Sequence, residues 1–274
     1  MSAEVSAPAN AGEWIGRDLG TRTVSWTDRD AILYALAVGA PADRLDLVFE
    51  DRMRVLPTFA LTLAQWAPDV LAEAGAWEVA TALHGSQKLT VLGEMPIAGE
   101  MEMSARVAAV WDKGAAAVFE IEVTSPYVVA TWSVFAPGIG GFGGERGPSR
   151  PAGPEGEATG SGSLTVAENS AALYRLTGDR HHIHIDPVAA QASGQPKPFL
   201  QGLATVASAT LVLADAAGVH PADLASLEGR FSSVVFPGEE LTVATWQGEG
   251  EGETLFTVAT DRGVAIDGGR ISFR

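Results

Sequence analysis

The stretch FLQGLATVASATLVLADAAG, residues 199–218, is a long run of small and apolar residues. Alanine and leucine favour helices, and no charged stripe divides the run, so it predicts a long buried helix. Segments rich in β-branched and aromatic residues follow it, near residues 230–236, 240–248, 254–263 and 265–273. This order indicates an antiparallel sheet packed on one helix.

The first part of the chain repeats this plan. Thr27 and Asp30 form a capping pair before a helical run at 31–40, and a second helical segment spans 58–75. Predicted strands then cover residues 78–92, 100–114, 116–125 and 126–135. The second part opens at 163–170, with a short helical pattern near 168–176. We therefore expect an α+β fold with an antiparallel sheet in each half, arranged as a fused pseudo-dimer.

A segment dominated by glycine, proline and serine separates the two halves. It has too few apolar side chains to anchor a core and is typical of a linker. We predict an N-terminal domain at 1–137, a linker at 138–163 and a C-terminal domain at 164–274. The GIGGFGG run inside it lacks the ending of a phosphate-binding P-loop, so nucleotide binding is not expected.

Composition excludes several classes of protein. The 34 acidic residues outnumber the 18 basic ones, and a formal net charge of −16 repels nucleic acid and anionic lipid. The absence of cysteine excludes disulfides, thiolate nucleophiles and zinc fingers. No apolar run is long enough to span a membrane, no secretory signal is present, and the final ISFR is not a peroxisomal signal. These features predict a cytoplasmic protein.

The densest group of titratable residues is YRLTGDRHHIHIDP, residues 174–187. His184 with Asp179 can form a general acid/base pair, because histidine titrates near neutrality and a carboxylate orients it. His181 and His184 with Asp179 or Asp186 can equally hold a divalent metal. A solvated turn with no chemical role is the third interpretation.

Residues 174–210 resemble the signature of the MaoC-like, R-specific enoyl-CoA hydratases, also called hydratase 2. In that family a Y-x-x-S/T-G-D-x-N-P-x-H-x-D-P segment precedes a P-x-x-H-G helix start. Further blocks resemble its two-domain members: TDRDAILYALAVGA, RVLPTFAL, LHGSQ, AVWDKG, GGFGGERG and RFSSVVFPGEEL. The resemblance covers nearly the whole chain from Trp14 onward.

The resemblance implies a double hotdog fold, with a sheet wrapped around a long helix in each half. Only the second half keeps the catalytic motif, and the first shapes the site for long acyl chains. The family adds water to a trans-2-enoyl-CoA to give the (3R)-3-hydroxyacyl-CoA, or removes it. It uses no cofactor and no metal, since coenzyme A belongs to the substrate.

The same resemblance assigns the site residues. Asp179 is the base and His184 its partner, and together they hold one water against the enoyl thioester. The backbone N–H of Gly202 stabilises the thioester oxyanion at a helix start. Thr210 is expected to bond the catalytic aspartate, or alternatively its own helix backbone.

The resemblance also points to contacts with coenzyme A and the rest of the substrate. Lys113 is the expected phosphate contact, and Arg180 and Lys197 flank the catalytic segment and add to the basic patch. The full set of predicted substrate-binding residues is His84, Gly85, Lys113, Arg180, His181, His182, Ile183 and Phe231.

The chain departs from the family pattern at three positions. His181 and His182 replace its asparagine and proline, and Gln201 replaces the histidine before Gly202. The leading hypothesis is an active hydratase. The alternatives are a catalytically silent acyl-CoA-binding or scaffold protein, and a metal-dependent hydrolase built on His181 and His184. We expect an acyl-CoA substrate, no nucleic-acid or membrane partner, and a homodimer.

Overall fold

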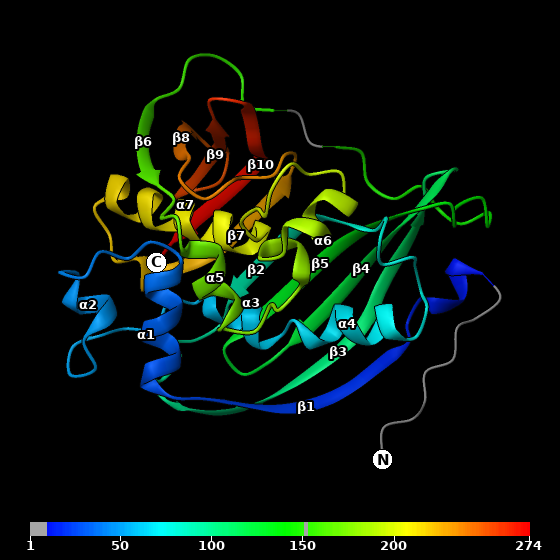
Figure 1. The fold of residues 1–274 in the computed structure, drawn as a ribbon, viewed down its shortest axis with the longest axis horizontal. Coiled ribbons are helices and arrows are strands. Elements are labelled where there is room, and N and C mark those ends of the chain that lie inside the picture. The colour runs from blue at the N-terminus through cyan, green and yellow to red at the C-terminus, as the bar shows by residue number, and fades with distance from the viewer. Residues whose placement is uncertain (1–9, 151–152) are drawn as a thin grey trace.

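The computed structural model describes residues 10–150 and 153–274. Residues 1–9 of the predicted N-terminal domain and residues 151–152 of the predicted linker lie outside these ranges. Ten strands form one sheet in the order β1-β3-β4-β5-β2-β7-β10-β9-β8-β6, and every pairing is antiparallel (Figure 1). The strands are β1 Asp18–Trp26, β2 Leu83–Val91, β3 Gly99–Asp112, β4 Ala116–Thr124, β5 Val128–Pro137, β6 Gly160–Thr165, β7 Leu224–Phe231, β8 Glu240–Gln247, β9 Glu253–Thr260 and β10 Gly263–Phe273.

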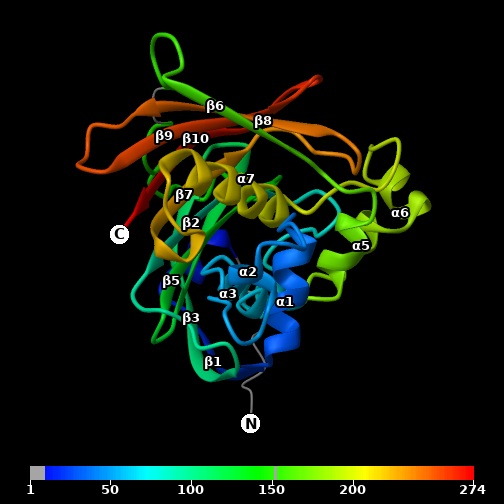
Figure 2. The same ribbon diagram turned by 90° about the vertical axis from the view of Figure 1, so that its left-hand side faces the viewer.

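The helices gather on one side of this curved sheet (Figure 2). They are α1 Asp28–Ala37, α2 Leu45–Val48, α3 Phe59–Leu63, α4 Trp66–Glu73, α5 Ser170–Arg175, α6 Pro187–Ala192 and α7 Gly202–Ala217, with short 3-10 turns η1 Ala11–Trp14, η2 His182–His184 and η3 Pro221–Asp223. The capping box predicted from Thr27 and Asp30 is present at the start of α1. None of the described helices is long and apolar enough to cross a bilayer.

Apolar and charged side chains alternate along the strands, and this alternation determines which face of the sheet is buried. Along β3, Met101, Met103 and Val107 are buried, whereas Glu102 and Arg106 are exposed. A strand turns successive side chains to opposite faces, so this pattern places the apolar ones against the helices. The first strand, β1, was not predicted from the sequence because its exposed edge leaves most of its side chains polar.

The sheet joins the two halves of the chain, the N-terminal half at 10–137 and the C-terminal half at 160–274. Strand β2 pairs with β7, with Leu89 opposite Leu227. On the helical side, Ser208 of α7 donates to the Val38 carbonyl at 2.7 Å, and Arg44 pairs with Asp215 at 2.9 Å. The α+β fold and the double hotdog arrangement are confirmed, but the two predicted sheets join through β2 and β7 into one continuous sheet.

The end of the predicted linker is corrected, because residues 160–163 belong to strand β6. A Cβ on Gly162 would lie 2.6 Å from Val212 Cγ1 of α7. The small residues here let a helix pack closely on an edge strand, and their composition does not indicate a flexible linker. Helix α7 packs against both β6 and β8, and its buried residues cover most of its circumference, as predicted.

The predicted second helix at 58–75 is two helices, α3 and α4. Proline has no N–H and its ring clashes with the carbonyl four residues earlier, which for Pro68 is Ala64. The chain therefore breaks its helix at Ala64 and Gln65, and Pro68 falls in the first turn of α4, where no N–H is needed. The N-terminal hotdog thus has an interrupted central helix.

Candidate active site

The turn between α5 and α6 carries the two predicted catalytic side chains. Asp179 Oδ1 accepts the backbone N–H of His181 at 3.1 Å, which fixes the carboxylate at the start of the turn. His184 ends the 3-10 turn η2 and is buried. Its Nε2 lies 3.8 Å from Asp179 Oδ2. The local sequence therefore brings together the two groups predicted to act as an acid/base pair.

The backbone of Phe199 sets the tautomer of His184. His184 Nδ1 lies 2.8 Å from the Phe199 carbonyl, which only accepts, so the ring proton is on Nδ1. Burial lowers the pKa of His184, and the charge of Asp179 opposes this only in part. The ring is therefore neutral at pH 7, with the lone pair of Nε2 facing a carboxylate oxygen. Two acceptors 3.8 Å apart cannot bond each other, but one water can donate to both.

The N-terminal half packs against this turn through helix α3. Gly178, directly before Asp179, has φ +152, which favours glycine. A Cβ on Gly178 would lie 3.1 Å from the backbone oxygen of Thr62 in α3. The position of Asp179 thus depends on close contact between backbone segments of the two halves.

Replacing Gly178 with alanine should move Asp179 and reduce turnover more than it reduces stability. We expect at least a tenfold loss of kcat, because the Thr62 carbonyl belongs to a helix and cannot yield, and a stability loss of about 1–3 kcal/mol. Gly218→Ala is the matched control, since it also has positive φ but has no atoms within 4 Å of its Cβ position. Equal kcat in the two variants would contradict this account.

A second group forms where the halves meet at β2 and β7. Gly202 begins α7, so its N–H has no acceptor inside the helix and lies at the positive end of the helix dipole. A Cβ on Gly202 would lie 3.1 Å from two ring atoms of Phe231, the last residue of β7. The Phe231 ring packs on the His84 ring of β2, with centroids 4.7 Å apart. Gly202, Phe231 and His84 are therefore neighbours, although they come from three distant segments.

The two groups share one electrostatic environment. Burial lowers the pKa of His84 to about 4, although the Asp179 carboxylate acts in the opposite direction. His84 is therefore neutral at pH 7, with Nε2 3.1 Å from the Ser86 carbonyl. Phe199, whose carbonyl holds His184, is three residues before Gly202. The acid/base pair and the helix start consequently belong to one site.

His84 should make the fold sensitive to acid. Its pKa is near 6.5 when unfolded and about 4 when folded. A lowered folded pKa means that stability is fully present above pH 6.5 and is lost as the pH falls toward 4. Between pH 7 and pH 5 we expect His84→Asn to lose about 1–2 kcal/mol less unfolding free energy than wild type. Urea unfolding measures this, with exposed His182→Asn as the control. An equal loss in all three proteins would contradict it.

The remaining predicted substrate residues take varied positions. Gly85 lies at an irregularity of β2, with its Cβ position 3.3 Å from the Ser133 carbonyl oxygen. The His181 ring lies 6.2 Å from the His184 ring, and its Nδ1 accepts the Ile183 N–H. Arg180 and His182 are exposed beside the catalytic turn, and Ile183, within η2, is half-buried.

Lys113 lies apart from this group. It is in the turn between β3 and β4, where its Nζ donates to the Arg146 carbonyl. The preceding Asp112 accepts the N–H groups of Gly141 and Gly143, both at 2.8 Å. Strand β5 separates this turn from β2, a spacing of about 10 Å. The turn fastens the glycine-rich segment, and it does not bring Lys113 to His84.

The expectation that Thr210 bonds the catalytic aspartate is corrected. The hydroxyl of Thr210 donates to the Val206 carbonyl at 2.9 Å, so its one proton is already used within α7. Thr210 also lies eight residues beyond Gly202, about 12 Å along the helix axis. The structure gives it a local helical role.

The histidine cluster does not assemble a metal site. Within residues 10–150 and 153–274, no three or more His, Asp or Glu side chains are placed to hold a metal ion. Asp186, which the metal interpretation used, instead caps α6 by accepting the Val188 N–H at 2.8 Å. The geometry therefore gives the metal-dependent hydrolase no support.

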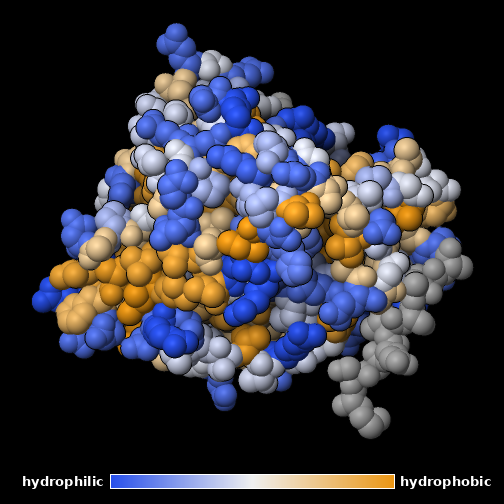
Figure 3. Space-filling view, viewed as in Figure 1, coloured by the Kyte–Doolittle hydropathy of each residue, from blue (hydrophilic) through white to orange (hydrophobic). Residues whose placement is uncertain are grey.

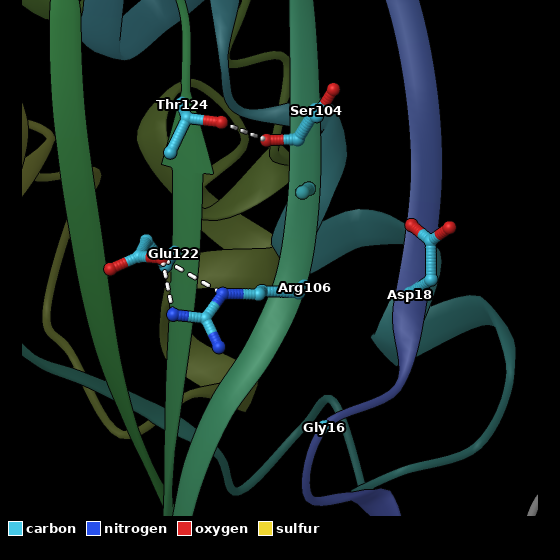
Figure 4. Close-up of a pocket in the computed structure, with 7 residues that line it drawn as sticks. Gly16, Asp18, Ser104, Arg106, Glu122 and Thr124 are labelled. Carbon is cyan, nitrogen blue, oxygen red and sulfur yellow. Dashed lines mark hydrogen bonds and ion pairs between the residues drawn. The ribbon is translucent and has the colours of Figure 1, made fainter.

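A shallow groove of about 190 Å³ lies on β1, β3 and β4, away from this site (Figure 4). It is lined by Gly16, Asp18, Ser104, Ala105, Arg106, Glu122 and Thr124. Arg106 and Glu122 form an ion pair across it at 2.7 Å, so each neutralises the charge of the other. Exposed residues of β3 line it, so it opens on the solvent side of the sheet. We assign it no part in catalysis.

Sequence reasoning missed two contributors to the site, Phe199 and Thr62. Both act through backbone carbonyls, one on the His184 ring and one against the Gly178 turn. A carbonyl is common to every residue, so no side-chain pattern could have identified them.

The fold and the site define a double hotdog protein with an Asp–His acid/base pair beside a helix start. Family models match both halves: the MFE-2 hydratase 2 N-terminal domain at residues 24–135 and the MaoC-like domain at 152–265. The chain belongs to the MaoC-like hydratase 2 family of enoyl-CoA hydratases.

Individual relatives agree with this assignment. The chain is 35% identical to the enoyl-CoA hydratase ChsH3 of Mycobacterium tuberculosis, over 92% of this chain and 94% of that protein. It is 36% identical to 3-hydroxyacyl-thioester dehydratase Y of the same organism, over 90% and 93%. Among solved structures, a MaoC-like dehydratase from Phytophthora capsici superposes with a TM-score of 0.85 at 25% identity, over 96% and 97% of the chains.

Proposed function

We propose that the chain catalyses the reversible hydration of a trans-2-enoyl-CoA to the (3R)-3-hydroxyacyl-CoA. It is a hydro-lyase of its family, and its relatives are named enoyl-CoA hydratase and 3-hydroxyacyl-thioester dehydratase. The single observation that carries the proposal is the pair of acceptors, His184 Nε2 and Asp179 Oδ2, 3.8 Å apart. Such a pair holds one water by both of its protons.

The chemistry follows from this geometry. The water oxygen bonds to Cβ of the enoyl group while one water proton passes to the pair, Asp179 acting as base and His184 as its partner. The pair returns a proton to Cα on the same face, so the net change is the addition of one water. Negative charge develops on the thioester oxygen in between, and the N–H of Gly202 is the donor proposed for it. Phe231 and His84 line the approach to that donor.

Coenzyme A contacts remain proposals. The two halves join where strand β2 pairs with strand β7, and this is where Phe231, His84 and Gly85 lie. Lys113 lies about 10 Å further across the sheet. Coenzyme A is long enough to reach both places. A cofactor-free reaction and a cytoplasmic location stay predictions from the sequence.

Absorbance of the conjugated enoyl thioester tests the function. Purified wild-type protein should remove the conjugated band of short-, medium- or long-chain trans-2-enoyl-CoA, and chiral analysis should identify the (3R) product. Saturable binding of enoyl-CoA without loss of the band would instead establish the silent acyl-CoA-binding protein. Stoichiometric zinc, iron or manganese in the purified protein, together with loss of activity in chelator, would support the metal-dependent hydrolase.

The homodimer is a further proposal. Figure 3 shows an apolar patch over α1 and α2. Leu36 of α1 and Leu45 of α2 are exposed apolar side chains of these helices. An apolar patch of this kind favours association. Light scattering of the purified chain measures the oligomeric state directly.

A further inference from the structure

A carboxylate at the end of β3 holds a loop against the turn that carries Lys113. Asp112 is only 7% exposed, and its carboxylate accepts three backbone N–H groups. Those of Gly114 and Gly141 reach Oδ1 and that of Gly143 reaches Oδ2, each at 2.8 Å. These bonds lower the pKa of Asp112, that of Gly141 most, so the carboxylate is charged at pH 7. Both of its oxygens are engaged by the backbone.

Residues 138–147, which we call the glycine strap, follow β5 and lie on this turn. Besides its bonds to the carboxylate of Asp112, the strap accepts the Asp112 N–H through the carbonyl of Glu145 at 2.8 Å. Two residues further on, a Cβ on Gly147 would overlap the ring of Trp111, so the strap lies directly on that ring. Contacts with β3 therefore fix the strap on both sides of the residue between Glu145 and Gly147.

That residue is Arg146, and the strap brings it beside Lys113. The Nζ of Lys113 donates to the Arg146 carbonyl, and both side chains are exposed or half-buried. Neither cation forms an ion pair with an acidic side chain in the part of the chain that the structure describes. By contrast, Arg150 and Arg230 share the carboxylate of Asp267. Lys113 and Arg146 are thus neighbouring cations whose charges no carboxylate pairs with.

This pair of cations lies at the end of the sheet where the proposed thioester site is. Strand β2 begins at Leu83, which pairs with Phe135 near the end of β5. Strand β4 begins at Ala116, which pairs with Pro137, the last residue of β5. The start of β2, with His84, and the β3–β4 turn are therefore at the same end of the sheet. A coenzyme A thioester held at His84 can extend along this end to the turn.

We propose that Arg146 binds a phosphate of coenzyme A together with Lys113, and that Asp112 is the positioning residue that holds the two cations side by side. A guanidinium matches phosphate oxygens with paired N–H donors, and an ammonium adds a point charge. Lys113 can bond a phosphate without leaving the Arg146 carbonyl, because an ammonium has three N–H donors. The net charge of −16 repels phosphate over most of the surface, so a local pair of cations has a clear use. The inference rests on the proposed hydratase function.

The test compares two thioesters of one acyl group, trans-2-enoyl-CoA and trans-2-enoyl-pantetheine, which has no phosphate. Arg146→Gln should raise KM for the enoyl-CoA by about threefold to tenfold and leave kcat unchanged, since a phosphate contact is the same in the ground state and the transition state. The enoyl-pantetheine should show no such rise. Arg29→Gln is the matched control, because Arg29 is an exposed arginine of α1 paired with Asp30. It removes the same charge and should leave both thioesters unaffected.

Asp112→Asn tests the positioning role. An amide nitrogen cannot accept an N–H, so at least one of the three bonds to the backbone is lost. We expect KM for the enoyl-CoA to rise by about threefold to tenfold, again without a rise for the enoyl-pantetheine. In a chain that already carries Lys113→Gln and Arg146→Gln, the same change should add nothing, because Asp112 acts through those two side chains. A merely structural role would weaken turnover of both thioesters equally.

An unchanged KM of Arg146→Gln for the enoyl-CoA would overturn the phosphate contact, and equal losses on the two thioesters in Asp112→Asn would overturn the positioning role. Should Asp112→Asn fail to fold, Gly147→Ala displaces the strap from the Trp111 ring and carries the same test. An inactive wild type would remove the hydratase function itself. Calorimetric titration with coenzyme A alone would then still test the contact, with a threefold to tenfold weaker affinity expected in Arg146→Gln, of about the same size as the change in KM.

Discussion

Asp179→Asn should lower kcat by about 10²–10⁴-fold without changing the fold. The amide has the same shape as the carboxylate, but it cannot take a proton from water. It also turns an N–H toward the site, so the water loses one of its two acceptors. The backbone N–H of His181 can still bond the amide oxygen, which keeps the turn in place. The measurement is loss of the enoyl absorbance at saturating substrate, with melting temperature recorded beside it.

Asp43→Asn is the matched control for this variant. Asp43 is exposed in the segment between α1 and α2, and replacing it removes the same unit of charge. It should leave kcat and KM unchanged. Asp179→Asn with more than a tenth of wild-type kcat would exclude Asp179 as the base.

His184→Asn should have a comparable effect, about 10²–10⁴-fold on kcat. The asparagine side-chain N–H can replace Nδ1 as the donor to Phe199, but nothing then replaces Nε2 opposite Asp179. The matched control is His220→Asn, which changes the histidine that caps η3 beyond the far end of α7 and should leave kcat unchanged. If the pair acts as one unit, Asp179→Asn with His184→Asn should be little worse than either single change. Multiplicative losses would show two independent functions.

The pH dependence gives an independent check on His184. Burial lowers its pKa, and catalysis uses the neutral ring, so activity should persist below pH 6.5 and fall only when the ring gains a proton. If kcat/KM instead decreases as the pH rises above 6.5, the charged ring is the active form.

The catalytic turn was predictable because its parts are close in sequence. Asp179 and His184 are five residues apart, and a turn of that length can bring two side chains together without help from the rest of the fold. The start of α7 at Gly202 was equally visible, since a long apolar run has a definite beginning. Strand positions followed from alternation of apolar and polar residues, with two exceptions. Strand β1 was missed, because its edge position leaves its side chains mostly exposed. The strand predicted at 230–236 was wrongly placed, since β7 covers Leu224–Phe231.

Composition misled at two places for physical reasons. The small residues of 160–163 were interpreted as a linker, whereas they allow α7 to approach β6. The apolar run at 58–75 predicted one helix, but Pro68 permits two short ones. In both cases a residue type has two structural uses, and only the neighbouring element shows which applies.

The sequence by itself determined the α+β class, the two-fold repeat of the hotdog plan and the proximity of Asp179 to His184, because each depends on local periodicity or short spacing. The tertiary structure alone decided which residues join that pair. It packs His84 of β2 on Phe231 of the neighbouring strand β7. It places the Thr62 carbonyl against Gly178, and it directs the hydroxyl of Thr210 to a carbonyl of its own helix. Such contacts join segments more than a hundred residues apart, or use backbone atoms that every residue has, so no local pattern encodes them.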